Sequence, residues 1–172
     1  MKSEIFFDLE TLKLSDEVPG GWSSISSFGL AVGVTWDQEH GFRRWFEKDV
    51  ASLVAELEKF SRIISFNGER FDFEVLRGYT PVANLRKKSL DLLVDLRSRL
   101  GFRVKLDDLA RDTLGQAKTG SGLEVVRWWR AGQQEKVCKY CENDVQLLVD
   151  LVGFARRTGY VRVGQESIQV KW

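Results

Sequence analysis

The stretch that most constrains this chain is Ile5–Thr11, which reads IFFDLET. Three apolar residues predict a buried strand, and two carboxylates, Asp8 and Glu10, follow at its end two positions apart. Side chains alternate between the faces of a strand, so both acids are expected on one face, where like charges repel and each resists loss of water. A bound divalent cation would relieve this repulsion, although a solvated strand end that carries two acids explains the pattern equally well at this point.

The size and charge of the chain set limits on its class. Its 172 residues are enough for one domain with a single core, and we expect one domain over 1–172. The formal net charge of +1 excludes a general basic field for nucleic acid, so a polyanion would be held by a local patch or through metal ions. No apolar run approaches a membrane span and no leader is visible, so a cytoplasmic location without a membrane partner is expected.

The order of apolar patterns predicts an α/β fold. An antiparallel meander opens the chain, and strands and helices then alternate, which indicates a mixed sheet flanked by helices. Further strands are expected over 25–36, 42–46, 62–66 and 89–92, helices over 50–60, 73–77, 93–100, 106–114, 123–131 and 134–158, and a terminal β-hairpin over 160–171.

Two later acids stand out by their context. Asp72 follows an apolar strand and a glycine turn at a helix start, where an anion is favoured for structural reasons alone. Asp144 lies in the middle of the last helix, four residues after Tyr140 and on the same face as Val137 and Leu148. That face points inward, and a carboxylate directed inward needs a partner.

The two cysteines form a lone C-x-x-C, Cys138 and Cys141, in the same helix. A zinc site needs another pair of ligands, and the only histidine, His40, lies far away in the sequence in a turn-like segment. We therefore predict that both are core or half-buried thiols.

Three short motifs carry a resemblance to a known family. Phe7–Thr11 (FDLET), Asn67–Asp72 (N-x-x-x-F-D) and Tyr140–Asp144 (Y-x-x-x-D) occur in the order and at the approximate spacing of the DEDD superfamily of 3′ to 5′ exonucleases, in its tyrosine (DEDDy) form. The resemblance runs from residue 5 to about residue 150. Among subgroups the chain most resembles compact ribonuclease H-like nucleases related to the proofreading domains of family B DNA polymerases, and this implies a ribonuclease H-like fold.

The resemblance implies that Asp8, Glu10, Asp72 and Asp144 bind two metal ions. Their chemistry agrees, because hard oxygen donors without a suitable histidine or cysteine select Mg²⁺ or Mn²⁺ over zinc. Two such ions about 3.5 to 4 Å apart hydrolyse phosphodiester bonds by activating a water and stabilising the leaving oxygen. Tyr140 takes the place of the histidine of the other subtype. Because a phenol with a pKa near 10 is a weak base, we expect it to orient the water.

The predicted substrate is a single-stranded or frayed 3′ end of DNA or RNA. Candidate substrate contacts are Asn67, Phe71, Trp22 and Lys118, since bases stack on aromatic rings and a lysine can touch a phosphate. Structural roles remain open for three of them: Asn67 can simply hold its loop, Phe71 can belong to the core, and Trp22 can pack on the surface. Two other functions also remain open, a catalytically inactive nucleic-acid binding module and a ribonuclease H-type endonuclease. The sequence does not decide between DNA and RNA or name protein partners.

Overall fold

A computed structural model describes residues 2–116 and 122–172 of the chain, and its centre is a five-stranded sheet. The strands are β1 (Lys2–Thr11), β2 (Leu30–Asp37), β3 (Gly41–Phe46), β4 (Phe60–Ser65) and β5 (Ser89–Asp91), in the spatial order β3-β2-β1-β4-β5. β1, β2 and β3 pair antiparallel, whereas β4 runs parallel to β1 and β5 runs parallel to β4. This confirms the predicted α/β fold with an antiparallel meander followed by parallel strands.

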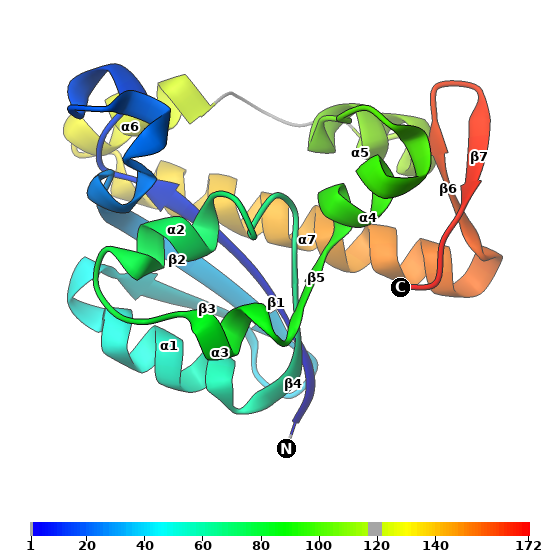
Figure 1. Ribbon diagram of the computed structural model, residues 1–172, viewed down its shortest axis with the longest axis horizontal. Helices are drawn as coiled ribbons and strands as arrows, with labels where there is room; N and C mark the ends of the chain where they lie inside the picture. The colour runs from blue at the N-terminus through cyan, green and yellow to red at the C-terminus, as the bar shows by residue number, and fades with distance from the viewer. Residues whose placement is uncertain (1, 117–121) are drawn as a thin grey trace.

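Helices cover both faces of the sheet (Figure 1). Their bounds are α1 Val50–Glu58, α2 Asp72–Arg77, α3 Ala83–Arg86, α4 Leu92–Leu100, α5 Leu106–Leu114, α6 Gly122–Arg130 and α7 Gln134–Thr158. α1, α2 and α3 contribute to the core on one face, and α4, α5, α6 and α7 contribute to the core on the other. A second small sheet, β6 (Tyr160–Val163) with β7 (Glu166–Gln169), forms the expected terminal hairpin and packs against α5 and α7. None of the described helices is both long and apolar enough to cross a membrane.

The alternation of side chains along β1 divides the core in two. Ile5, Phe7 and Leu9 belong to the cluster on the α1 and α2 side, whereas Phe6 belongs to the cluster on the α7 side. Asp8 and Glu10 continue the face of Phe6, because positions two apart share a face. The central strand therefore directs its two acids toward α7.

The structure differs from the sequence-based expectation in a few places. The expected strand 25–36 begins only at Leu30, because Ile25–Ser27 is a short 3₁₀ helix and Gly29 has a left-handed φ of 72° that breaks an extended chain. Phe60 begins β4 and does not end the preceding helix. The four-residue helix α3 was not expected, since so short an element leaves no periodic pattern.

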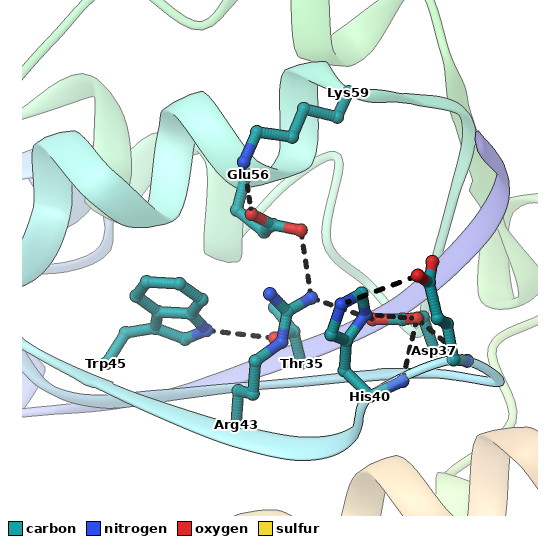
Figure 2. Close-up of polar contacts among 8 residues, drawn as sticks. Thr35, Asp37, His40, Arg43, Trp45, Glu56 and Lys59 are labelled. Atoms are coloured by element: carbon teal, nitrogen blue, oxygen red, sulfur yellow. Dashed lines mark hydrogen bonds and ion pairs between the residues drawn. The ribbon is translucent and has the colours of Figure 1, made fainter. Parts of the chain in front are cut away.

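A polar network fastens the β2–β3 hairpin to α1 (Figure 2). The Arg43 guanidinium donates to the carboxylates of Asp37, at 2.7 Å, and Glu56, at 2.9 Å. His40 and Asp37 contact each other at 3.0 Å, and Lys59 donates to Glu56 at 2.8 Å. Both acids are buried, which by itself raises a carboxyl pKa, but these hydrogen bonds and charges hold the pKa of Asp37 and of Glu56 below the ordinary values.

Candidate active site

Three carboxylates converge between the end of β1 and the middle of α7. Asp8 lies opposite Val34 and Glu10 lies opposite Val32 in the pairing of β1 with β2, which places both acids on the face that α7 covers. Asp144 comes from α7 and is only 3% exposed. One carboxylate oxygen from each of these three residues lies within 4.8 Å of the others.

Asp72 reaches the same region from the opposite side of the sheet. It is the first residue of α2, is 2% exposed, and accepts a hydrogen bond from the backbone N–H of Leu9 at 3.1 Å. Burial raises its pKa well above the ordinary value, and the negative charges of Asp8 and Asp91 raise it further. Asp72 is outside the group of three, but its hydrogen bond to Leu9 places it against the residue that lies between Asp8 and Glu10 in β1.

This group of acids fits a hard divalent cation. The donors are carboxylate oxygens, which are the ligands that Mg²⁺ and Mn²⁺ prefer. Two of them are almost fully buried, where negative charge is costly unless a positive charge compensates it. Of the predicted residues, Asp8, Glu10 and Asp144 are therefore brought together and could hold a metal ion, and Asp72 lies next to β1 through its hydrogen bond to Leu9.

A cysteine thiol lies against this group. The Sγ–H of Cys141 donates to Oδ2 of Asp8 at 3.4 Å, and the residue is fully buried. Burial raises the thiol pKa well above its usual value, as do Asp8, Glu10 and Asp144, so the thiol stays protonated. Both cysteines are buried and free, as predicted. The contact with Asp8 was not predicted, because nothing in the sequence indicates a pairing across 133 residues.

Tyr140 lies one helical turn before Asp144. Its ring is 5% exposed and packs edge-on against Trp128 of α6, with ring centroids 6.0 Å apart. On the same segment of α7, Glu135 and Glu142 each accept a hydrogen bond from Arg44 of β3 at 2.6 Å. These two ion pairs fix the part of α7 that carries Tyr140 to the edge of the sheet.

The loop that leads to Asp72 is held in place by the buried side chain of Asp91. The Asp91 carboxylate accepts hydrogen bonds from the backbone N–H of Asn67 at 2.8 Å and of Glu69 at 3.0 Å. It also caps α4 by accepting from the N–H of Leu93 at 2.9 Å. Sequence analysis did not identify this positioning role. The feature of the sequence that could have indicated it is an aspartate between a strand and a leucine-rich helix.

The aromatic candidates gather beside this loop. Trp22, which is 61% exposed, packs against Phe28 with centroids 5.8 Å apart and against Phe71 at 6.2 Å. A pocket of about 300 Å³ opens here, lined by Trp22, Ile25, Asn67, Arg70, Phe71 and Arg103. Three of the four predicted substrate contacts thus share one pocket. The fourth, Lys118, lies outside the described residues.

The comparisons with known proteins agree with the fold described above. The family model described as the RNase H superfamily matches residues 5–155 of the chain. The chain belongs to the RNase H superfamily. Its structure is similar to that of the family B DNA polymerase from the hyperthermophilic archaeon Pyrobaculum calidifontis, with a TM-score of 0.65 and 13% sequence identity over 89% of this chain and 24% of the polymerase. The chain therefore spans about a quarter of that polymerase. No curated protein matches the sequence.

A second group of potential metal ligands lies away from the three carboxylates, at the turn between β2 and β3. Ligand atoms of Asp37, Glu39 and His40 also lie within 4.8 Å of one another, at the β2–β3 turn. Here the carboxylate of Asp37 already accepts from Arg43 and from two backbone N–H groups of the turn, those of Glu39 and His40 (Figure 2). These hydrogen bonds stabilise the hairpin turn, and this explains why the three residues lie close together.

Proposed function

We propose that the chain is a metal-dependent 3′ to 5′ exonuclease of the tyrosine (DEDDy) form, acting on single-stranded or frayed nucleic-acid ends. The observation that carries this proposal is the convergence of the carboxylates of Asp8, Glu10 and Asp144 within 4.8 Å, with buried Asp72 hydrogen-bonded to Leu9 between the two acids of β1. Membership of the RNase H superfamily over most of the chain supports a nuclease. The three motifs Phe7–Thr11, Asn67–Asp72 and Tyr140–Asp144 support the direction of cleavage.

In this proposal Asp8, Glu10, Asp72 and Asp144 hold two Mg²⁺ or Mn²⁺ ions. Bound there, the ions would activate a water and stabilise the leaving 3′ oxygen of a phosphodiester bond. The protein contributes position and charge. The acids are carried by a central strand and by two helices packed on opposite faces of the sheet, so their spacing is fixed by the core.

Tyr140 is proposed to orient the attacking water through its hydroxyl. Trp128 fixes the ring, and the ion pairs from Arg44 fix the helix segment. A neutral phenol can donate one hydrogen bond and accept others, which suits it to orienting a water more than to deprotonating it.

Substrate is proposed to enter as a single strand. The net charge of +1 gives no long-range attraction for duplex, so affinity has to come from local stacking and from the bound cations. The exposed ring of Trp22, beside Phe71 and the loop of Asn67, provides a surface on which an unpaired base can stack.

The test is a cleavage assay on strands labelled at the 5′ end. Single-stranded DNA and RNA with Mg²⁺ or Mn²⁺ should each be compared with a blunt duplex and with a circular single strand that is labelled internally. We expect a ladder that shortens from the 3′ end, no cleavage of the circle, and loss of the ladder in Asp8→Asn. The matched control Asp16→Asn removes the same charge from an exposed site in the loop after β1 and should keep full activity.

Other outcomes would support the alternatives. Cleavage of the circle, or of the RNA strand of a hybrid at internal positions, would indicate a ribonuclease H-type endonuclease. Binding of single strands without any cleavage under both metals would indicate an inactive nucleic-acid binding module.

A further inference from the structure

Two arginines beside the active site have no acidic partner. The guanidinium groups of Arg43, Arg44, Arg86, Arg99, Arg130 and Arg156 each form an ion pair with a carboxylate. Within residues 2–116 and 122–172, no carboxylate lies within ion-pair distance of Arg70 or Arg103. Both line the pocket of about 300 Å³ that also contains Trp22 and Phe71. Both side chains are exposed to solvent, and two arginines without an ion pair among the described residues on one pocket give it a local positive charge that favours an anionic ligand.

The position of Arg103 is set by an asparagine with an unusual backbone. Asn67 has a left-handed φ of 68°, a conformation that asparagine tolerates better than most residues. Its side-chain oxygen accepts a hydrogen bond from Nη2 of Arg103 at 3.1 Å, although Arg103 lies 36 residues later in the chain. The loop of Asn67 therefore holds the guanidinium at the wall of the pocket.

The loop itself is held firmly enough to keep this arrangement. The Asp91 carboxylate accepts from the N–H groups of Asn67 and Glu69, and Arg86 donates both to the carbonyl and, at 3.0 Å, to the side chain of Glu69. Arg70 follows Glu69 directly in the chain. Because these contacts hold the loop in one conformation, little ordering of the loop is needed on binding.

The remaining walls are aromatic, and they lie next to the proposed metal ligands. Phe71 immediately precedes Asp72, and Trp22 presents a largely exposed ring whose other contacts are to Phe28 and Phe71. A planar base can stack on the indole while guanidinium groups pair with the attached phosphate, and guanidinium is well suited to phosphate because it donates two parallel hydrogen bonds. The volume is at the small end of the usual range for ligand pockets, which suits one nucleotide unit.

We propose that this pocket binds one nucleotide of the single-stranded substrate next to the cleaved end, with its base on Trp22 and its phosphate between Arg70 and Arg103. This deepens the proposed function, on which it rests for the identity of the strand. It assigns two substrate-binding residues, and it explains how a chain with almost no net charge retains a strand: two arginines supply local positive charge at the pocket.

The proposal is tested by binding without catalysis. An eight-nucleotide single strand labelled with fluorescein is titrated with protein in EDTA, by fluorescence anisotropy, over a series of KCl concentrations. We expect Arg70→Gln and Arg103→Gln each to weaken binding by about ten- to hundredfold, as for loss of a hydrogen bond to a charged group. Each should also lower the slope of log K against log salt by about 0.7, the value for one phosphate contact on a single strand.

Matched variants separate this role from others. Arg157→Gln removes the same charge from an exposed arginine near the end of α7 that forms no ion pair within residues 2–116 and 122–172, and it should change neither affinity nor slope. Arg103→Lys keeps the charge and should keep the slope while it weakens binding, because the paired donors are lost. Trp22→Leu should weaken binding without changing the slope, and it should remove quenching of tryptophan fluorescence by the strand. Thermal unfolding of each variant checks that the fold is intact.

Three results would overturn the proposal: unchanged affinity and slope in Arg70→Gln and Arg103→Gln, equal losses in Arg157→Gln, or no binding of the strand in EDTA. The outcome is independent of catalysis. If the pocket variants behave as expected but no nuclease ladder appears, the pocket stands as a single-strand site and the exonuclease proposal fails. If a ladder appears and the arginine variants bind normally, the exonuclease stands and this inference fails.

Discussion

Replacing Tyr140 by phenylalanine removes one hydroxyl and leaves the ring in its place against Trp128, 6.0 Å away between centroids. Because the packing is kept, the free energy of unfolding should fall by about 1 kcal/mol at most, compared with about 3 to 5 kcal/mol for removing a buried aromatic ring. If the hydroxyl orients the attacking water, kcat should fall by about ten- to ten-thousandfold, which corresponds to about 1.4 to 5.5 kcal/mol in activation free energy. Mn²⁺ affinity, measured by titration calorimetry, should not change.

Tyr79→Phe is the matched control for this prediction. The hydroxyl of Tyr79 donates to Glu47 at 2.6 Å and accepts from the N–H of Leu30 at 2.9 Å, and burial together with the hydrogen bond to Glu47 raises its pKa to about 12. Loss of these two bonds should lower stability by about 1 to 2 kcal/mol, or roughly 2 to 8 °C in Tm, without affecting kcat. Initial rates on a 3′-ended single strand and thermal unfolding of both variants are compared. Full activity in Tyr140→Phe, or equal loss of activity in both, would refute a role in orienting the water.

Three further perturbations have expected outcomes. Asp144→Asn should abolish cleavage and raise the Tm of the metal-free protein, because it removes charge from a repelling group, and a large fall in Tm measured in EDTA would instead make this acid structural. The pair of Glu17 with Arg130 lowers the pKa of Glu17 from 4.5 to about 2, so its contribution is complete above pH 4.5 and is lost as pH falls toward 2. Urea unfolding of Glu17→Gln should therefore show a flatter pH dependence across that window than wild type. Gly153→Ala, in the interior of α7, should raise the free energy of unfolding in urea by about 0.5 to 1 kcal/mol, because the new Cβ would meet only the flexible end of Arg157 at 3.4 Å.

The long, periodic elements were predictable from sequence, including their ends. α5 and α7 occupy the expected ranges because each has a strong apolar periodicity and is followed by a glycine, Gly115 or Gly159, with a left-handed φ. The convergence of Asp8, Glu10 and Asp144 was also predictable, since strand alternation and helix spacing fix the direction of each side chain. Their roles in metal binding and catalysis stay predictions.

Contacts between distant segments were not predictable. The thiol of Cys141 against Asp8 and the hold of Asp91 on the Asn67 loop depend on how α7 and β5 meet the rest of the sheet, and no local pattern encodes either contact. The hydrogen bond between Arg103 and Asn67 was not predictable for the same reason. The late start of β2 was missed because Ile25 is apolar and buried, as a strand residue would be, although it lies in a 3₁₀ helix.

The alternation in β1 also determines which misfolded forms of the protein can arise. A slip of one residue in its pairing would turn Asp8 and Glu10 into the apolar cluster of Ile5, Phe7 and Leu9 and would turn those three side chains toward α7 in their place. Such a molecule would bury two unpaired carboxylates and would not fold stably. Folded molecules in which Asp8 and Glu10 point away from α7 should therefore not accumulate. A destabilising core variant should then lower the amount of active protein and leave the turnover of each remaining molecule unchanged.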